Sequence, residues 1–171
     1  MEDLKAEYSQ YSLDDFMKQC KILKDDGSIE ATEWYEFAQE LSGQYDSFAL
    51  ICYLIYLGKD KSNSDKRFLS LDHVAHTLLA ANKKKQALGY AEKAWNLKHS
   101  VDSADLLIEI GHQIKDPNVI SKYTQLKGQL VTVGAHKAVA KKQTKKIENN
   151  LKKKLKANDF DDDAPEDSDN E

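Results

Sequence analysis

Residues 68–98 read FLSLDHVAHTLLAANKKKQALGYAEKAWNLK, and they carry the clearest periodic pattern in the chain. Apolar residues recur at helical spacing from Leu71 to Leu79, and again from Ala87 to Trp95 after the polar residues 82–85. Several of these residues are alanines, whose small side chains let two helix axes approach closely. The segment therefore predicts a helical hairpin. One hairpin cannot bury its apolar stripe alone, so it requires similar neighbours on either side.

Three further helices are predicted before this hairpin. Ser12 is a favourable N-cap for a helix over residues 13–25, which Gly27 ends, and Ser28 is expected to cap the next helix, which ends near Gly43. The third covers residues 48–58, and the polar loop 58–66 follows it. The expected buried positions are Phe16, Cys20 and Leu23 with Leu13 and Met17 beside them, then Trp34, Phe37, Ala38 and Leu41, then Phe48, Ala49, Cys52, Tyr53 and Tyr56. Residues 1–10 have only weak patterning and are interpreted as a lead-in.

Two more helices are predicted after residue 98. Residues 103–115 carry one apolar stripe, and Asp116-Pro117 marks a new start, because Asp is a favoured cap and Pro is tolerated at the first helical position. The helix that follows has Val119, Tyr123, Leu126 and Leu130 on one face. Short connections between successive helices favour antiparallel packing. The predicted fold class is therefore all-α, built from antiparallel helical hairpins in a domain over residues 1–132.

The composition points to a soluble helical protein in a reducing compartment. Charged residues make up 32% of the chain and hydrophobic residues 40%. Cys20 and Cys52 lie in apolar helical patterns without metal-ligand spacing, so we expect buried, reduced thiols. The chain begins with acidic and polar residues, and its longest apolar run, residues 48–57, is about half a bilayer span. We therefore expect a cytoplasmic location and no membrane span.

The order of large and small residues recurs three times along the chain. The three sets are Trp34, Phe37, Ala38 and Leu41; Leu71, Val74, Ala75 and Leu78; and Leu107, Ile110, Gly111 and Ile114. A small residue lets the first helix approach its partner while the large ones fill the grooves, and Ala49, Ala87 and Tyr123 follow at matching distances. This pattern resembles the tetratricopeptide (TPR) repeat family, in units of about residues 30–58, 67–99 and 103–131. The repeat starts lie 37 and 36 residues apart, whereas the family's spacing is 34.

The resemblance implies a short TPR-like α-solenoid whose first helices line a concave groove that holds a partner's peptide or helix. The residues expected to line this groove are Tyr35, Gln39, Asp72, His76, Ile108, His112 and Lys115. Aromatic and aliphatic groups would give contact area, and polar groups would fix orientation. The family's clamp for acidic chaperone tails requires Lys, Asn and Arg at set places, which Tyr35, Gln39, Asp72 and His76 do not reproduce. Each of these residues can equally be ordinary helix surface.

Signatures of catalysis are absent from the sequence. Nucleotide-binding, zinc-protease and nucleophile-elbow motifs do not occur. His73 and His76 are close enough along one helix to share a metal, but no third ligand stands at a recognisable spacing, so packed or solvated histidines are the preferred interpretation. We therefore expect a non-catalytic adaptor or chaperone without cofactor or metal. Its partner is expected to be another protein.

The C-terminal extension combines two opposed blocks of charge. Residues 133–158 carry nine lysines and one glutamate and predict a Lys-rich helix, whereas residues 159–171 carry eight acidic side chains and predict a disordered acidic tail. The helix could bind polyanions non-specifically, so a nucleic-acid or ribosome-associated function stays open as the alternative. The lysines proposed for such contacts are Lys141, Lys142, Lys145, Lys146, Lys152, Lys153 and Lys154. A solvated helix, partly neutralised by the tail, is the simpler interpretation.

Overall fold

The computed structural model describes the backbone of residues 1–158 and the side chains of residues 1–134, 142, 144–146, 148 and 149. The chain divides into two compact units, residues 1–128 and 129–171. The predicted acidic tail, 159–171, lies outside the described residues. Within them every regular element is a helix, so the all-α prediction is confirmed. No helix among them is long and apolar enough to cross a membrane.

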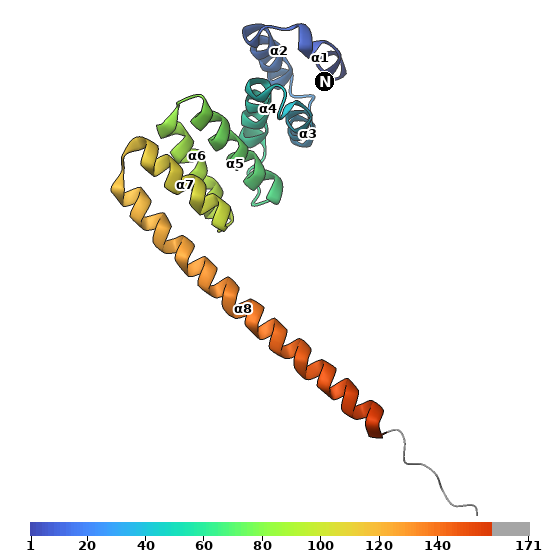
Figure 1. The fold of residues 1–171 in the computed structure, drawn as a ribbon. Coiled ribbons are helices and arrows are strands. Elements are labelled where there is room, and N and C mark those ends of the chain that lie inside the picture. The colour runs from blue at the N-terminus through green and yellow to red at the C-terminus, as the bar shows by residue number, and fades with distance from the viewer. Residues whose placement is uncertain (159–171) are drawn as a thin grey trace, which may run out of the picture. The chain divides into compact units, whose positions relative to one another are not determined.

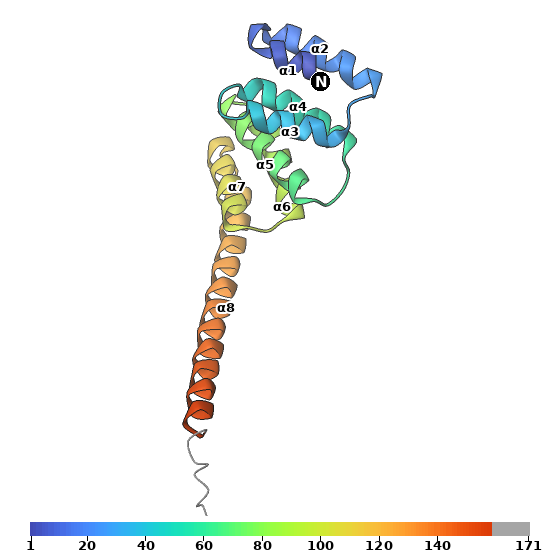
Figure 2. The same ribbon diagram turned by 90° about the vertical axis from the view of Figure 1, so that its right-hand side faces the viewer.

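The first unit consists of short helices that pack against their sequence neighbours (Figures 1 and 2). In order they are α1 (Glu2–Glu7), the 3₁₀ turn η1 (Tyr8–Gln10), α2 (Leu13–Asp26), α3 (Ala31–Leu41), α4 (Asp46–Lys59), α5 (Asp65–Ala80), α6 (Lys84–Leu97), α7 (Val101–Ile114) and the start of α8 (Pro117–Asn158). The pairs α3/α4 and α5/α6 make the most extensive contacts, and α4/α5 and α6/α7 join them. The predicted hairpin of residues 68–98 therefore exists as α5 and α6.

Local capping explains where these helices begin. Ser12, Ser64 and Ser100 each accept a hydrogen bond from a backbone N–H three residues later, at 3.1–3.2 Å. Asp116 Oδ1 accepts from the N–H of Asn118 at 2.9 Å, so the Asp-Pro start of α8 is confirmed. Ser28 does not cap α3, however, because Glu30 takes that place and its N–H donates to Glu33 Oε2 at 2.9 Å.

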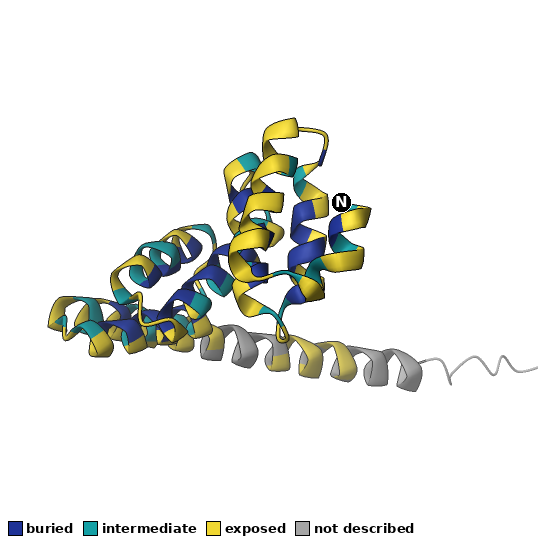
Figure 3. Cartoon of the chain, turned by 90° about the horizontal axis from the view of Figure 1, so that it is seen from above, coloured by how far each residue is buried: buried dark blue, intermediate teal, exposed yellow. Residues whose placement is uncertain are grey.

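Each helix of the first unit turns its apolar stripe toward its neighbours, and Figure 3 shows buried and exposed residues on different sides of the helices. The three repeat positions Trp34, Leu71 and Leu107 are 0%, 2% and 0% exposed. The small positions behave alike, since Ala38, Ala75 and Gly111 are all buried. The large–small order read from the sequence therefore marks buried positions on α3, α5 and α7.

Two expectations about the N-terminal end of the unit were wrong. Residues 1–10 are not a plain lead-in, because they form α1 and η1, and Leu4 is buried. On α2 the buried residues are Phe16 and Cys20, whereas Leu13 and Met17 are 42% and 50% exposed. At the other end, the helix that begins at Pro117 continues without interruption as α8 through Asn158, so it includes the segment predicted as a Lys-rich helix. Gly128 and Gly134 therefore do not break it.

Candidate functional site

Tyr35, expected in the groove, is a core residue instead. Its side chain is only 4% exposed, because its ring packs on Tyr53 and Tyr56 of α4, with centroids 6.0 and 5.3 Å apart. Lys66 of α5 covers the ring, with Nζ 5.1 Å from the centroid. Burial raises the pKa of the Tyr35 hydroxyl above its usual value. Tyr35 therefore joins α3, α4 and α5 rather than facing a partner.

Asp72 and His76 lie together on α5, as the groove prediction requires. His76 Nε2 is 3.7 Å from Asp72 Oδ2, and the side chains are 58% and 31% exposed. Partial burial raises the pKa of the Asp72 carboxyl, although the neighbouring His76 and His73 oppose this shift. This exposed pair is a polar surface feature of α5 that offers both a donor and an acceptor.

The other expected groove residues, Gln39, Ile108, His112 and Lys115, are at least partly accessible. Gln39 on α3 and His112 on α7 are exposed, and Ile108 is half-buried. Lys115 ends α7 in the left-handed conformation, with φ 58°, and its side chain is exposed. Two pairs among the seven predicted residues interact, namely Asp72 with His76 and Gln39 with the Tyr35 hydroxyl. Their binding role stays a prediction.

His73 differs from its neighbour His76 because it is packed inside. Its ring lies against Tyr53 of α4, with centroids 4.8 Å apart. Burial lowers the pKa of His73 below its usual value, and its Nε2 is buried without a hydrogen-bond partner. His73 is therefore a packed residue at the α4/α5 contact. No cluster of three or more His, Cys, Asp or Glu side chains suited to a metal occurs in the described part of the chain.

The two thiols are buried, as expected. Cys20 on α2 and Cys52 on α4 are both free, and they are 1% and 0% exposed. Burial raises the pKa of the Cys52 thiol far above its usual value, and the adjacent Cys20 thiol reinforces this shift. Because the thiolate is the reactive form, both residues serve here as small core side chains.

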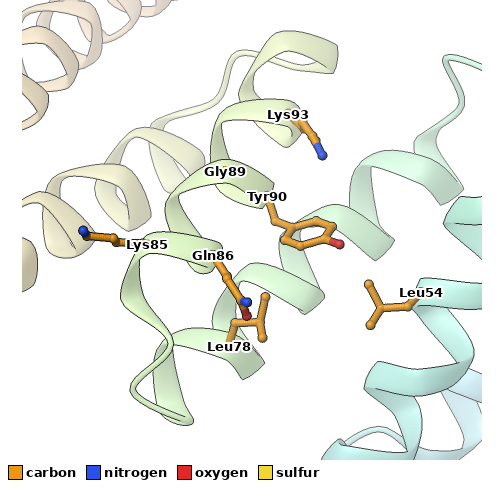
Figure 4. Close-up of a pocket in the computed structure, with 7 residues that line it drawn as sticks. All are labelled: Leu54, Leu78, Lys85, Gln86, Gly89, Tyr90 and Lys93. Carbon is orange, nitrogen blue, oxygen red and sulfur yellow. The ribbon is translucent and has the colours of Figure 1, made fainter.

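Sequence reasoning did not predict a pocket that lies between α4, α5 and α6 of the first unit. It has a volume of about 410 Å³ and is lined by Leu54 of α4, Leu78 of α5, and Lys85, Gln86, Gly89, Tyr90 and Lys93 of α6. In Figure 4, Leu54 and Tyr90 face one another from α4 and α6, with Gln86 and Leu78 beside them. Lys93 Nζ lies 5.0 Å from the centroid of the Tyr90 ring. None of the seven predicted groove residues is among its lining residues.

Two further pockets adjoin this α4–α6 pocket. One, of about 270 Å³, shares Leu54, Tyr90 and Lys93 with it and adds Lys61 and Arg67. The other, of about 430 Å³, shares Lys85 and Gln86 and adds residues 82–84 and Ile114. A signal for this surface is present in the sequence as the run Lys83–Lys85 and Lys93, although residues 82–85 are predicted only to be the polar break between two helices.

The second unit is described by its helix and by few side chains. Of the seven lysines proposed to bind polyanions, Lys142, Lys145 and Lys146 are exposed. The side chains of Lys141, Lys152, Lys153 and Lys154 lie outside the described residues. The three exposed lysines stand three and four residues apart, so they share one side of α8.

Comparison of the chain with protein-family models, with curated proteins and with solved structures found no match.

Proposed function

We propose that this protein is a non-catalytic protein–protein interaction adaptor or chaperone, and that its stacked hairpins form a TPR-like groove for a partner's peptide or helix. The observation that carries the proposal is the shared burial pattern of α3, α5 and α7, which we interpret as the first helices of three repeats. Each contributes one fully buried large residue and one buried small residue, Trp34 with Ala38, Leu71 with Ala75, and Leu107 with Gly111. Repeats of this kind expose a row of first-helix surfaces, which suits extended ligands.

The groove proposed here has one lining residue fewer than the sequence predicts, because Tyr35 belongs to the core. Its accessible members are Gln39, Asp72, His76, Ile108, His112 and Lys115. The polar members would orient a ligand, and Ile108 would supply apolar contact. We also propose that the protein acts in the cytoplasm, where the reduced state of its two buried thiols is normal.

A capture experiment tests this function. The full-length chain is immobilised, exposed to extract from its own cells and washed at low and then high salt. Gln39→Arg and His112→Arg each place a long cation on the proposed groove, and Gln19→Arg makes a matched change on the exposed surface of α2. We expect the partner to stay bound in the high-salt wash, because salt does not screen apolar contacts. We expect the two groove variants, but not Gln19→Arg, to lose this partner. Equal retention by all variants would show that the groove is not the binding surface.

A second candidate function is non-specific polyanion binding through α8. It is favoured by the exposed lysines 142, 145 and 146 in a segment with nine lysines and one glutamate. Replacement of these three lysines with glutamine should abolish retention of RNA on the immobilised protein at low salt if this candidate is right. The same variant should leave a groove-bound partner in place.

A further inference from the structure

The surface made by the α4–α6 pocket and its two neighbours has a charge opposite to that of its surroundings. Residues 1–132 carry an excess of acidic over basic side chains, 20 against 16. Among the described residues, however, the charged side chains that line the three pockets are all cationic: Lys61, Arg67, Lys83, Lys84, Lys85 and Lys93. Pockets lined by one sign of charge focus the electrostatic potential and attract counter-ions. We call this surface the basic pocket surface.

Some of these cations have a structural role and others do not. Lys61 Nζ donates to the carbonyl of Leu57 at 3.0 Å, and Arg67 donates to the carbonyls of Leu57 and Asp60, so both hold the C-terminal end of α4. Lys84 Nζ lies 3.5 Å from the carbonyl of Gln113. Lys85 and Lys93 are exposed on α6. These two lysines are therefore the best placed to meet an anionic ligand.

The centre of the surface is apolar. Leu54 is 38% exposed although it belongs to the most apolar helix of the unit, and it faces the Tyr90 ring across the pocket (Figure 4). Leu78 contributes a third apolar side chain. Burial of a Leu-sized side chain against these three residues would remove apolar surface from water and so favour binding. A small anion alone would leave these groups in contact with water, so the surface favours a ligand that is both acidic and apolar.

We propose that the basic pocket surface is a second docking site, and that it binds an acidic peptide segment of another protein through one apolar side chain in the α4–α6 pocket. A peptide carries carboxylates and an aliphatic or aromatic side chain on one backbone, which matches Lys85 and Lys93 around Leu54 and Tyr90. A nucleic acid matches the lysines through its phosphates and could stack a base on Tyr90, but it has no aliphatic side chain to pack against Leu54 and Leu78. This proposal rests on the proposed protein-binding function and adds a site that lies outside the first-helix groove.

Fluorescence anisotropy with a labelled peptide tests the proposal directly. The probe is a short peptide in which Asp and Glu flank a single Leu, and the control probes replace Leu with Ser or replace the acids with their amides. With the full-length chain at low salt, Lys85→Glu and Lys93→Glu should each weaken binding about fivefold or more, because like charges then oppose the probe. Leu54→Asn should weaken it about tenfold, as expected for loss of a buried Leu contact.

Matched variants distinguish effects at the pocket from effects of net charge or of a leucine substitution elsewhere on the protein. Lys24→Glu makes the same charge reversal on the exposed surface of α2, and Leu69→Asn makes the same change at a leucine that is 49% exposed outside these pockets. Both should bind the probe as the wild-type chain does, and thermal unfolding should show that every variant is folded. Gln39→Arg should also leave the probe affinity unchanged, because Gln39 belongs to the first-helix groove. The anisotropy experiment can therefore refute the second docking site without refuting the groove, and the capture experiment can do the reverse.

Four results would overturn the assignment. The first is absence of probe binding, or equal losses for Lys93→Glu and Lys24→Glu. The second is tighter binding of a single-stranded RNA oligonucleotide that depends on the same lysines, which would make the surface a polyanion site. The third is a several-fold gain in probe affinity when Asp161, Asp162 and Asp163 are changed to Asn, which would identify the chain's own tail as the occupant. The fourth is self-association that Lys93→Glu abolishes, which would assign the surface to a second copy.

Discussion

The hairpins α3/α4 and α5/α6 have the same antiparallel arrangement, yet their cores are filled by different kinds of side chain. The first buries Trp34, Tyr35 and Phe37 on α3, and the Tyr35 ring packs on Tyr53 and Tyr56 of α4. The second packs Val74 and Ala75 of α5 and three alanines of α6, all between 0% and 1% exposed. Large aromatic rings are prominent in the core of the first hairpin, whereas small side chains, which permit close approach of two helices, are prominent in the core of the second.

This difference shows that one helical pattern can be stabilised in two ways. In the first hairpin the tyrosines also carry polar groups, and the Tyr53 hydroxyl lies 3.3 Å from Ser42 Oγ. In the second hairpin the alanines leave no room for larger side chains. The first hairpin should therefore be sensitive to removal of atoms, and the second to their addition.

The largest effect is expected from Trp34→Ala in the first hairpin. Trp34 is 0% exposed, so the substitution should leave a cavity and lower the free energy of unfolding by about 3–5 kcal/mol. Urea denaturation followed by circular dichroism measures this change. Trp34→Phe should cost less, because it keeps much of the ring and removes a buried Nε1–H that has no partner. Similar costs for the two variants would contradict the cavity argument.

Ala75→Leu tests the second hairpin in the opposite direction. Ala75 is 0% exposed at a contact between closely packed helices, so the added atoms should lower stability by about 1–3 kcal/mol. Ala80→Leu makes the same change at the exposed end of α5 and should alter the unfolding free energy little. If both variants were equally stable, the second hairpin would not depend on small side chains.

A smaller, stabilising effect is expected at Gly89. An added Cβ there meets nothing within 4 Å, so Gly89→Ala should raise the free energy of unfolding by about 0.5–1 kcal/mol through helix propensity. Gly111→Ala should have the opposite sign, since its Cβ would lie 2.9 Å from Ile120 Cγ1 and 3.2 Å from the backbone nitrogen of Ile120. Thermal unfolding of both variants provides the comparison, and stabilisation by both would show that α8 can move away from α7.

The smallest effect concerns His73, where the two hairpins meet. Burial lowers the pKa of His73 in the folded protein, whereas the unfolded chain keeps the usual histidine pKa near 6.5. At pH values below about 6.5 the unfolded chain therefore binds more protons than the folded chain. The contribution of neutral His73 is therefore fully present above about pH 6.5 and decreases as the pH falls toward the folded pKa. As the pH is lowered from about 7 to 5, the urea concentration at the midpoint of unfolding should decrease more for the wild-type chain than for His73→Gln. Parallel curves would exclude His73 as the cause.

Most of the helices could be predicted from sequence, because their signals are local. Ser12, Gly27 and the pair Asp116-Pro117 act within a few residues of their own position, and the structure confirms all three. The short helix α1 was missed because six residues cannot form a stable helix alone. It depends on tertiary contacts such as burial of Leu4, which no local pattern indicates.

The candidate site was less predictable, because it depends on which helix faces are covered. Periodicity marks one apolar stripe on α3, but α4 and α5 cover an adjacent stripe as well, and Tyr35 is buried there. The α4–α6 pocket of the basic pocket surface combines residues from Leu54 to Lys93 on three helices. Each lysine alone is typical helix surface, and only the packing of α4 beside α6 brings them around apolar side chains.

Helix pairing between sequence neighbours has a kinetic consequence for residues 1–128. Contacts such as α3/α4 and α5/α6 join residues that are close along the chain, which gives a low relative contact order. Chains of this kind fold in about microseconds to milliseconds. The hairpin that contains Trp34 can therefore assemble during synthesis, before the ribosome has released the residues that follow it.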